Sequence, residues 1–135
     1  MKFQFSAGGI VIKGNEVLLC QHSQHHGWVF PKGLIGDHEK GEEKEDTAIR
    51  EVEEETGVKA KIVKSLTPVT YWFVLEGEKV RKTVYYFLME HVGGDITKHD
   101  HEMEKVEWLP KDKVEERLTY KSDKKVWEET LEILN

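Results

Sequence analysis

The acidic segment from residue 36 to residue 58, GDHEKGEEKEDTAIREVEEETGV, constrains this chain more than any other part of it. Its apolar residues recur at helical spacing and predict a helix over residues 42–56. Glu51, Glu54 and Glu55 then share one face, because residues three and four apart on a helix are neighbours. Crowded carboxylates repel one another, so this face favours a bound cation. Gly57 is a helix stop, since glycine adopts the left-handed conformation cheaply.

The order and spacing of the fixed residues in this segment resemble the box of the Nudix hydrolase family, G-x5-E-x7-R-E-U-x-E-E-x-G-U, with U an aliphatic residue. The alternative interpretation is an ordinary solvated acidic helix, against which the flanking Glu42 and Gly57 argue. Every fixed position of the box is filled, by Gly36, Glu42, Arg50, Glu51, Val52, Glu54, Glu55, Gly57 and Val58.

The resemblance implies an α/β fold, the Nudix α/β/α sandwich, in which a mixed β-sheet lies between helices and the box forms loop–helix–loop. Strands interspersed with helices also indicate this class, and residues 1–135 predict a single domain. Residues 22–40 are predicted as loop, and a last helix is predicted to start at a cap, Ser122 or Asp123. Strands are predicted over residues 3–12, 16–20, 59–73, 82–89 and 104–109, and a short helix from Pro110 toward Leu118.

The resemblance also implies a metal-dependent site. Glu51, Glu54 and Glu55 would be ligands of Mg²⁺, or of Mn²⁺, and a backbone carbonyl from the glycine loop before the helix would complete the site. Metal ions neutralise the charge of a pyrophosphate and acidify a bound water, which attacks phosphorus in line. The loop carbonyl belongs to Gly33 or to Gly36, because the loop is about three residues longer than the related pattern and both glycines fit.

Two further residues have predicted roles at this site. Arg50 would orient the site by pairing with a carboxylate such as Glu42 or Glu51, where the alternative is a surface ion pair of little worth. Glu102 precedes Trp108 at the spacing that the family uses for a distant carboxylate. Glu102 would be a further metal ligand or the general base, or else a solvated loop acid, and Glu51 is the alternative base.

The substrate-binding residues are suggested by a narrower resemblance. The runs SAGG, WVFPKG and KTVYYF are similar to the dinucleoside polyphosphate hydrolases of the diadenosine tetraphosphate type, and Trp28 and Lys32 lie in the second run. Lys82 and Tyr86 share a strand face. Lys32 and Lys82 would bind phosphate and Tyr86 would stack on adenine. The alternative places Tyr86 in the sheet core and Lys82 on the surface.

These features predict a Mg²⁺-dependent pyrophosphohydrolase that cleaves diadenosine tetraphosphate to ATP and AMP. Alternatives are a nucleoside triphosphate pyrophosphatase that removes oxidised nucleotides, and an enzyme that removes pyrophosphate from RNA 5′ ends. From a different class, a non-catalytic Nudix module would only bind a nucleotide. Such modules typically lose box carboxylates, whereas this chain has them all.

Composition argues against several partners. The chain has 135 residues and a formal net charge of −6, which argues against nucleic acid and an anionic membrane surface and leaves a small nucleotide as the expected partner. The single cysteine, Cys20, excludes an intramolecular disulfide and fits a reducing compartment. The absence of a signal-like or membrane-spanning run predicts a cytoplasmic protein. The sequence is compatible with a monomer or a homodimer.

Overall fold

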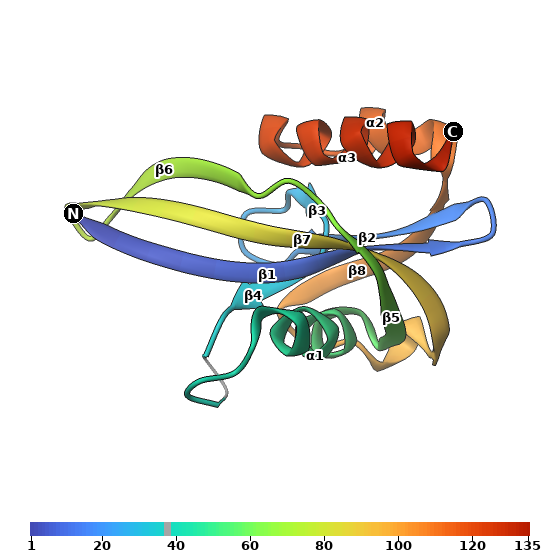
Figure 1. Cartoon of the computed structure of the whole chain (residues 1–135), viewed down its shortest axis with the longest axis horizontal. Coiled ribbons are helices and arrows are strands. Elements are labelled where there is room, and N and C mark those ends of the chain that lie inside the picture. Colours follow the sequence, from blue (N-terminus) through green and yellow to red (C-terminus); the bar gives the residue numbers. More distant parts are fainter. Residues whose placement is uncertain (37–38) are drawn as a thin grey trace.

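The computed structural model describes residues 1–36 and 39–135, which form a mixed eight-stranded sheet with helices on both faces (Figure 1). Helix α1 (Lys44–Thr56) covers one face, and α2 (Val114–Arg117) and α3 (Lys121–Leu134) lie over the other. This confirms the predicted α/β/α sandwich. The remaining elements are β1 (Lys2–Lys13), β2 (Glu16–His22), β3 (Trp28–Val29), β4 (Lys32–Leu34), β5 (Val58–Ser65), β6 (Val69–Leu75), β7 (Glu78–Gly94), η1 (Ile96–Lys98), β8 (Met103–Pro110) and η2 (Lys111–Lys113).

The parallel pair β1–β7 is the centre of the sheet, and every other strand pairing is antiparallel. β1 also pairs with β2 and β4, while β5 and β6 both pair with β7. Gly8 lets β4 approach β1, because a Cβ at Gly8 would lie 2.1 Å from the carbonyl oxygen of Pro31. This approach brings Lys32 and Gly33 onto the sheet, where both reach the candidate site.

Two apolar clusters hold the layers together. On the α1 side, Ala48 and Val52 pack with Phe87, so the predicted apolar stripe of the box helix faces the sheet. On the α3 side, Trp127 packs with Tyr86 and Phe30 in the larger cluster. Cys20 is buried. No helix in the described ranges is long and apolar enough to cross a membrane.

The structure corrects several predicted boundaries. The predicted loop over residues 22–40 contains the short strands β3 and β4, and the predicted strand over 59–73 is divided into β5 and β6 around Pro68, which has no N–H to donate to a ladder. Helix α1 begins at Lys44, two residues later than predicted. Two residues of the longer glycine loop, Asp37 and His38, lie outside the described residues.

The predicted caps of the last helix are wrong. The N-cap of α3 is Tyr120, which makes no side-chain cap hydrogen bond, and both Ser122 and Asp123 lie inside the first turn. The Asp123 side chain turns inward instead, where it is buried and accepts a hydrogen bond from the hydroxyl of Tyr86 at 3.0 Å. The tertiary partner on β7 determines its position more strongly than its capping propensity.

Helix α1 ends at Gly57, which has a φ of 80°, and a Cβ there would lie 2.0 Å from the carbonyl oxygen of Asp95. We expect Gly57→Ala to lower the free energy of unfolding by about 3 kcal/mol, from backbone strain plus this overlap. Gly77→Ala is the matched control, since Gly77 has a φ of 78° with open space around it. It should lose only about 1 kcal/mol in the same denaturant titration. Equal losses would contradict the packing role of Gly57.

Candidate active site

Two of the box carboxylates on helix α1 are buried. Glu51 and Glu55 are 6% and 5% exposed, whereas Glu54 is only partly buried. Glu55 accepts a hydrogen bond from the backbone N–H of Lys32 at 3.2 Å, which ties the helix to β4. The apolar stripe of α1 packs on the sheet. Glu51 and Glu55 lie beside this stripe on the helix surface, and they therefore contact β4.

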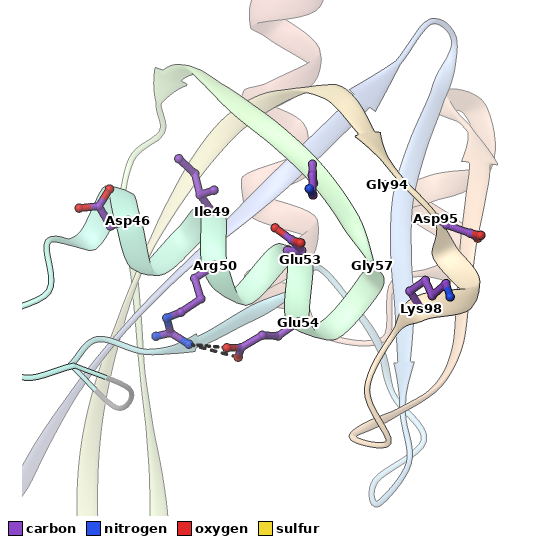
Figure 2. A pocket seen from close by; sticks show the side chains of 10 residues that line it. Asp46, Ile49, Arg50, Glu53, Glu54, Gly57, Gly94, Asp95 and Lys98 are labelled. Atoms are coloured by element: carbon purple, nitrogen blue, oxygen red, sulfur yellow. Dashed lines mark hydrogen bonds and ion pairs between the residues drawn. The ribbon is translucent and has the colours of Figure 1, made fainter.

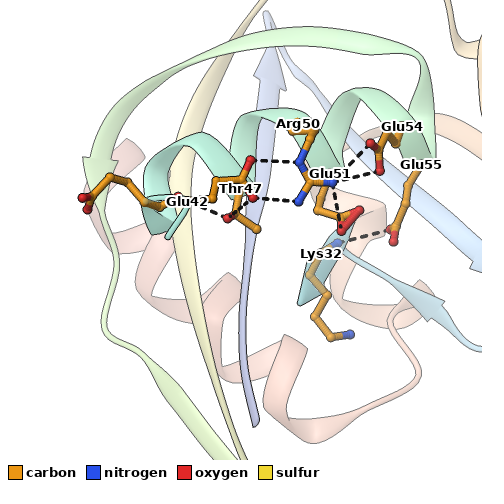
Figure 3. Close-up of polar contacts among 8 residues, drawn as sticks. Lys32, Glu42, Thr47, Arg50, Glu51, Glu54 and Glu55 are labelled. Atoms are coloured by element: carbon orange, nitrogen blue, oxygen red, sulfur yellow. Dashed lines mark hydrogen bonds and ion pairs between the residues drawn. The ribbon is translucent and has the colours of Figure 1, made fainter. Parts of the chain in front are cut away.

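Arg50 forms a clamp around the cluster (Figure 3). Its guanidinium donates to both oxygens of Glu42, at 2.8 and 3.0 Å, and to Glu54 at 3.1 Å. Its Nη1 also lies 3.6 Å from Glu51. Thr47 donates a further hydrogen bond to Glu42 at 2.7 Å. The partly buried geometry is bidentate, so Arg50 makes the carboxylate pairing expected of an orienting residue rather than a loose surface ion pair.

Gly33 lies directly against Glu51. A Cβ at Gly33 would overlap the Glu51 carboxyl, at 1.7 Å from Oε2. Gly36, with a φ of 79°, is placed differently, because the nearest described atom to a Cβ there is the carbonyl oxygen of Glu39 at 3.9 Å. Of the two candidate loop glycines, the structure therefore brings Gly33 to the carboxylates.

The electrostatics of the cluster fit a divalent cation. Burial raises the pKa of the Glu51 and Glu55 carboxyls, and the neighbouring carboxylates raise them further. A cation would relieve this repulsion, and carboxylate oxygens are the ligands that Mg²⁺ prefers. In the described ranges, however, no three acidic, histidine or cysteine side chains converge into a ready ligand set. Glu54 accepts a hydrogen bond from Arg50, and its proximity to Glu51 adds to the repulsion among the carboxylates.

The carboxylates line a cavity of about 440 Å³. Glu102 lies at its exposed rim, close enough for its charge to raise the pKa of Glu51 and Glu55. The structure thus brings the distant Glu102 to the same cavity as the box carboxylates. Other residues of this lining are His22, His25, Val29, Phe30, Lys32, Gly33, Leu34, Tyr71, Lys82 and Met103.

A second cavity of about 610 Å³ adjoins the first and lies on the α3 side of β4. Tyr71 and Phe73 of β6 line it, and the paired Tyr86 and Asp123 lie at its inner end. Tyr86 is 2% exposed, so the structure gives it a role in holding Asp123 and leaves little ring face for the predicted stacking on adenine. The residues that line both cavities are His25, Val29, Lys32, Tyr71 and Lys82.

The two lysines lie where the cavities join. Burial opposes the charge of Lys32, but nearby Asp123, Tyr71 and Glu55 outweigh it and raise its pKa. Burial and the charge of Lys32 lower the pKa of Lys82 to about 8. Burial also raises the pKa of the Asp123 carboxyl. Trp28 is absent from the two described linings, because its ring packs beneath the guanidinium of Arg117 at 4.6 Å.

A separate hollow runs along the outer face of α1, from Asp46 in the first turn to Gly57 at the C-terminal cap (Figure 2). Arg50 and Glu54 line it with Lys59 of β5 and Asp95 and Lys98 near η1. Glu54 therefore borders both this hollow and the carboxylate cavity. Its contact with Arg50 is dashed in Figure 2.

Sequence reasoning missed Tyr71 and Asp123 as site residues. Tyr71 stood in an apolar run that gave no sign of which face meets the substrate side. Asp123 had the position of a helix cap, and its burial depends on Tyr86, which is distant in sequence. No local pattern could have identified either residue.

A family model for the NUDIX domain matches residues 2–130. The chain belongs to the Nudix family. Members of this family generally use a divalent metal, typically Mg²⁺, and hydrolyse pyrophosphate bonds of nucleotide substrates. The box residues of this chain therefore lie within a Nudix domain, as the sequence predicted.

Two relatives are similar to this Nudix chain. It is 37% identical to MutT4 of Mycobacterium tuberculosis (strain CDC 1551 / Oshkosh) over 140 residues, covering 96% of this chain and 55% of that protein. It is 35% identical to the 8-oxo-(d)GTP phosphatase of Mycolicibacterium smegmatis (strain ATCC 700084 / mc(2)155), covering 82% of this chain and 32% of that protein. The chain thus spans about half and about a third of the length of these relatives.

Solved structures show the same fold. The MutT protein of Bacillus halodurans matches with a TM-score of 0.79 and 30% identity, over 95% of this chain and 82% of that one. A C. elegans Ap4A hydrolase binary complex matches with a TM-score of 0.75 and 23% identity, over 97% of each chain. The second likeness is one of fold alone, so the predicted similarity to diadenosine tetraphosphate hydrolases is found only among structural neighbours.

The contact between Gly33 and Glu51 makes a direct test of the loop assignment. We expect Gly33→Ala to lower turnover about 10²-fold, because the new methyl group displaces the Glu51 carboxyl. Gly36→Ala is the matched control, since its Cβ has space, and it should keep near-wild-type turnover in the same steady-state assay. The reverse pattern would place the functional glycine at Gly36.

The lowered pKa of Lys82 predicts a stability effect. Because this pKa falls from 10.5 to about 8 on folding, the charged lysine favours the unfolded chain, and wild-type stability gains as pH rises from 8 to 10.5. Lys82→Met should therefore raise Tm at pH 7, by an amount that shrinks toward pH 10.5, while it raises KM for the polyphosphate. A Tm gain that is constant across this pH range in calorimetry would contradict the buried charge.

Proposed function

We propose that this chain hydrolyses nucleoside triphosphates to the monophosphate and pyrophosphate, with oxidised purine nucleotides as the substrate class. The observation that carries the proposal is the junction of two unlike cavities. The carboxylate cavity suits a metal-bound polyphosphate, and the adjoining cavity, lined by Tyr71, Phe73 and Tyr86, suits one flat apolar base.

The buried end of the second cavity supports recognition of a base edge. One oxygen of Asp123 accepts from Tyr86, and the other makes no hydrogen bond to the described residues. Burial raises the pKa of Asp123, while Lys32 and the hydroxyl of Tyr86 lower it, and the second oxygen is placed to accept a hydrogen bond from a base edge. Oxidation of a purine exchanges donors and acceptors on its edge, and a buried polar group discriminates between such edges because an unmatched one is left unpaired.

The chain's own residues have separate tasks in this reaction. A bound Mg²⁺ at Glu51, Glu54 and Glu55 would neutralise phosphate charge and acidify water. Lys32 and Lys82 bind the phosphates where the cavities join. Glu51 or Glu102 accepts the proton of the attacking water, and the raised pKa of Glu51 brings that carboxyl nearer the working pH of a general base.

The relatives support this substrate class. MutT4 and the 8-oxo-(d)GTP phosphatase match by sequence across most of this chain, while the Ap4A hydrolase matches by fold. A dinucleoside polyphosphate also has a second base, which would need a second apolar site beyond the cavity that adjoins the carboxylates. Hydrolysis of diadenosine tetraphosphate is therefore the second candidate function, supported by Lys32, Lys82 and the sequence runs around them.

Product analysis by chromatography tests the proposal. With Mg²⁺, the wild-type protein should convert 8-oxo-dGTP to its monophosphate and pyrophosphate, at a higher kcat/KM than dGTP. Diadenosine tetraphosphate should be the poorer substrate. Preferred release of ATP and AMP from it would overturn the proposal in favour of the second candidate.

The variant Glu51→Gln shows whether the observed activity belongs to this site. It should lower turnover about 10²- to 10⁴-fold, the scale of a positioned acid–base group. Glu53→Gln on the exposed side of α1 is the matched control and should keep wild-type turnover. Turnover that survives Glu51→Gln unchanged would remove Glu51 from the reaction.

A further inference from the structure

Two histidine rings lie parallel to each other where β2 turns toward β3. His22 and His25 stack with ring centroids 4.3 Å apart and planes 9° apart. Each ring uses Nδ1 to accept a backbone N–H two residues ahead, from Gln24 at 3.1 Å and from Gly27 at 3.0 Å. Both rings line the carboxylate cavity. His25 also lines the second cavity, beside Tyr71 and Phe73, which we call the base cavity.

These contacts fix the tautomer of His25. A backbone N–H can only donate, so Nδ1 of His25 is an acceptor, and the proton of the neutral ring is on Nε2. The hydroxyl of Tyr120 lies 3.0 Å from the same Nδ1. Partial burial, with the nearby His22 and Lys32, lowers the pKa of His25. Nε2–H makes no hydrogen bond to the described residues, so this donor is available at the rim where the cavities join.

The turn is held rigidly from both sides. Trp28 donates its N–H to Oγ1 of Thr119 at 2.9 Å, and Thr119 returns its own N–H to the carbonyl of Trp28 at 3.2 Å. A Cβ at Gly27 would lie 2.8 Å from both His25 and Tyr120, so only glycine fits between them. His26 has a φ of 60°, a conformation that side chains rarely adopt. This arrangement presents His25 in one orientation before a substrate arrives.

We propose that His25 binds the 3′-hydroxyl of the nucleotide sugar through its neutral Nε2–H. In a nucleotide, the sugar connects the base to the phosphates, so it must lie where the base cavity meets the carboxylate cavity. Lys32 and Lys82 also line this junction, but their charges suit phosphate oxygens. His25 supplies an uncharged donor there, which suits a hydroxyl oxygen. The inference rests on the proposed function, because it requires a nucleotide in both cavities.

Two substitutions separate the two nitrogens of His25. His25→Asn keeps an acceptor near the Nδ1 position and holds the turn, but it removes the donor at Nε2. His25→Gln places an amide N–H near Nε2 and gives up the Nδ1 acceptor. His26→Asn is the control, since His26 is exposed, pairs with Glu104 and is absent from both described linings, and asparagine tolerates its positive φ.

Calorimetry measures the contact without turnover, using dGMP and its 2′,3′-dideoxy analogue. We expect the wild type and His26→Asn to bind the dideoxy analogue about three- to tenfold more weakly than dGMP, the value of one neutral hydrogen bond. His25→Asn should bind both nucleotides equally with an unchanged Tm, and His25→Gln should recover the preference. A wild-type preference that persists in His25→Asn, or a wild type that shows no preference or no binding, would overturn the inference.

Turnover of 8-oxo-dGTP, measured on the same preparations, separates this inference from the proposed function. A 3′-hydroxyl preference that depends on His25, in a protein that hydrolyses no triphosphate, would refute the proposed function and keep the sugar contact. Hydrolysis of 8-oxo-dGTP with no role for His25 in nucleotide binding would do the opposite.

Discussion

The structure depends on burying two carboxylates, Glu51 and Glu55, against the bare backbone of β4. Gly33 leaves just enough room for the Glu51 carboxyl, and the N–H of Lys32 ties Glu55 to the same strand. Buried carboxylates without a compensating cation are costly, and both pKa values are raised accordingly. The fold therefore maintains an arrangement that is unfavourable in itself, which is the expected condition of a site built for a cation.

The strand β4 explains how a polyphosphate and a base are held side by side. Consecutive residues of a strand point to opposite faces, so Gly33 meets α1 while the side chain of Lys32 extends toward Tyr71 and Asp123 on the α3 side. The carboxylate cavity and the base cavity thus adjoin at the edge of β4. Gly8 allows β4 to lie close to β1. The central strand β1 thereby positions β4 and the two cavities that meet at it.

The sequence predicted the elements whose signals are local. The spacing of the carboxylates and the apolar stripe gave the box helix, and Gly57 gave its end, because these depend on helix geometry alone. The short strands β3 and β4 had no such signal, since their pairing is set by distant partners. For the same reason Asp123 resembled a cap, Tyr86 resembled a stacking ring, and Gly33 and Gly36 were equivalent until the pairing of β4 with β1 distinguished them. The runs around Lys32 and Lys82 suggested one substrate subgroup, while the sequence relatives favour another.

The most direct test of the account is a titration of the protein with Mn²⁺, followed by electron paramagnetic resonance of the free ion. The account predicts a site in the wild type whose affinity falls about tenfold or more in Glu55→Gln, because a buried ligand is lost. Glu53→Gln, on the exposed side of the same helix, should bind as the wild type does. Equal Mn²⁺ binding by all three proteins, or none by the wild type, would contradict the claim that the buried carboxylates of α1 form a divalent cation site.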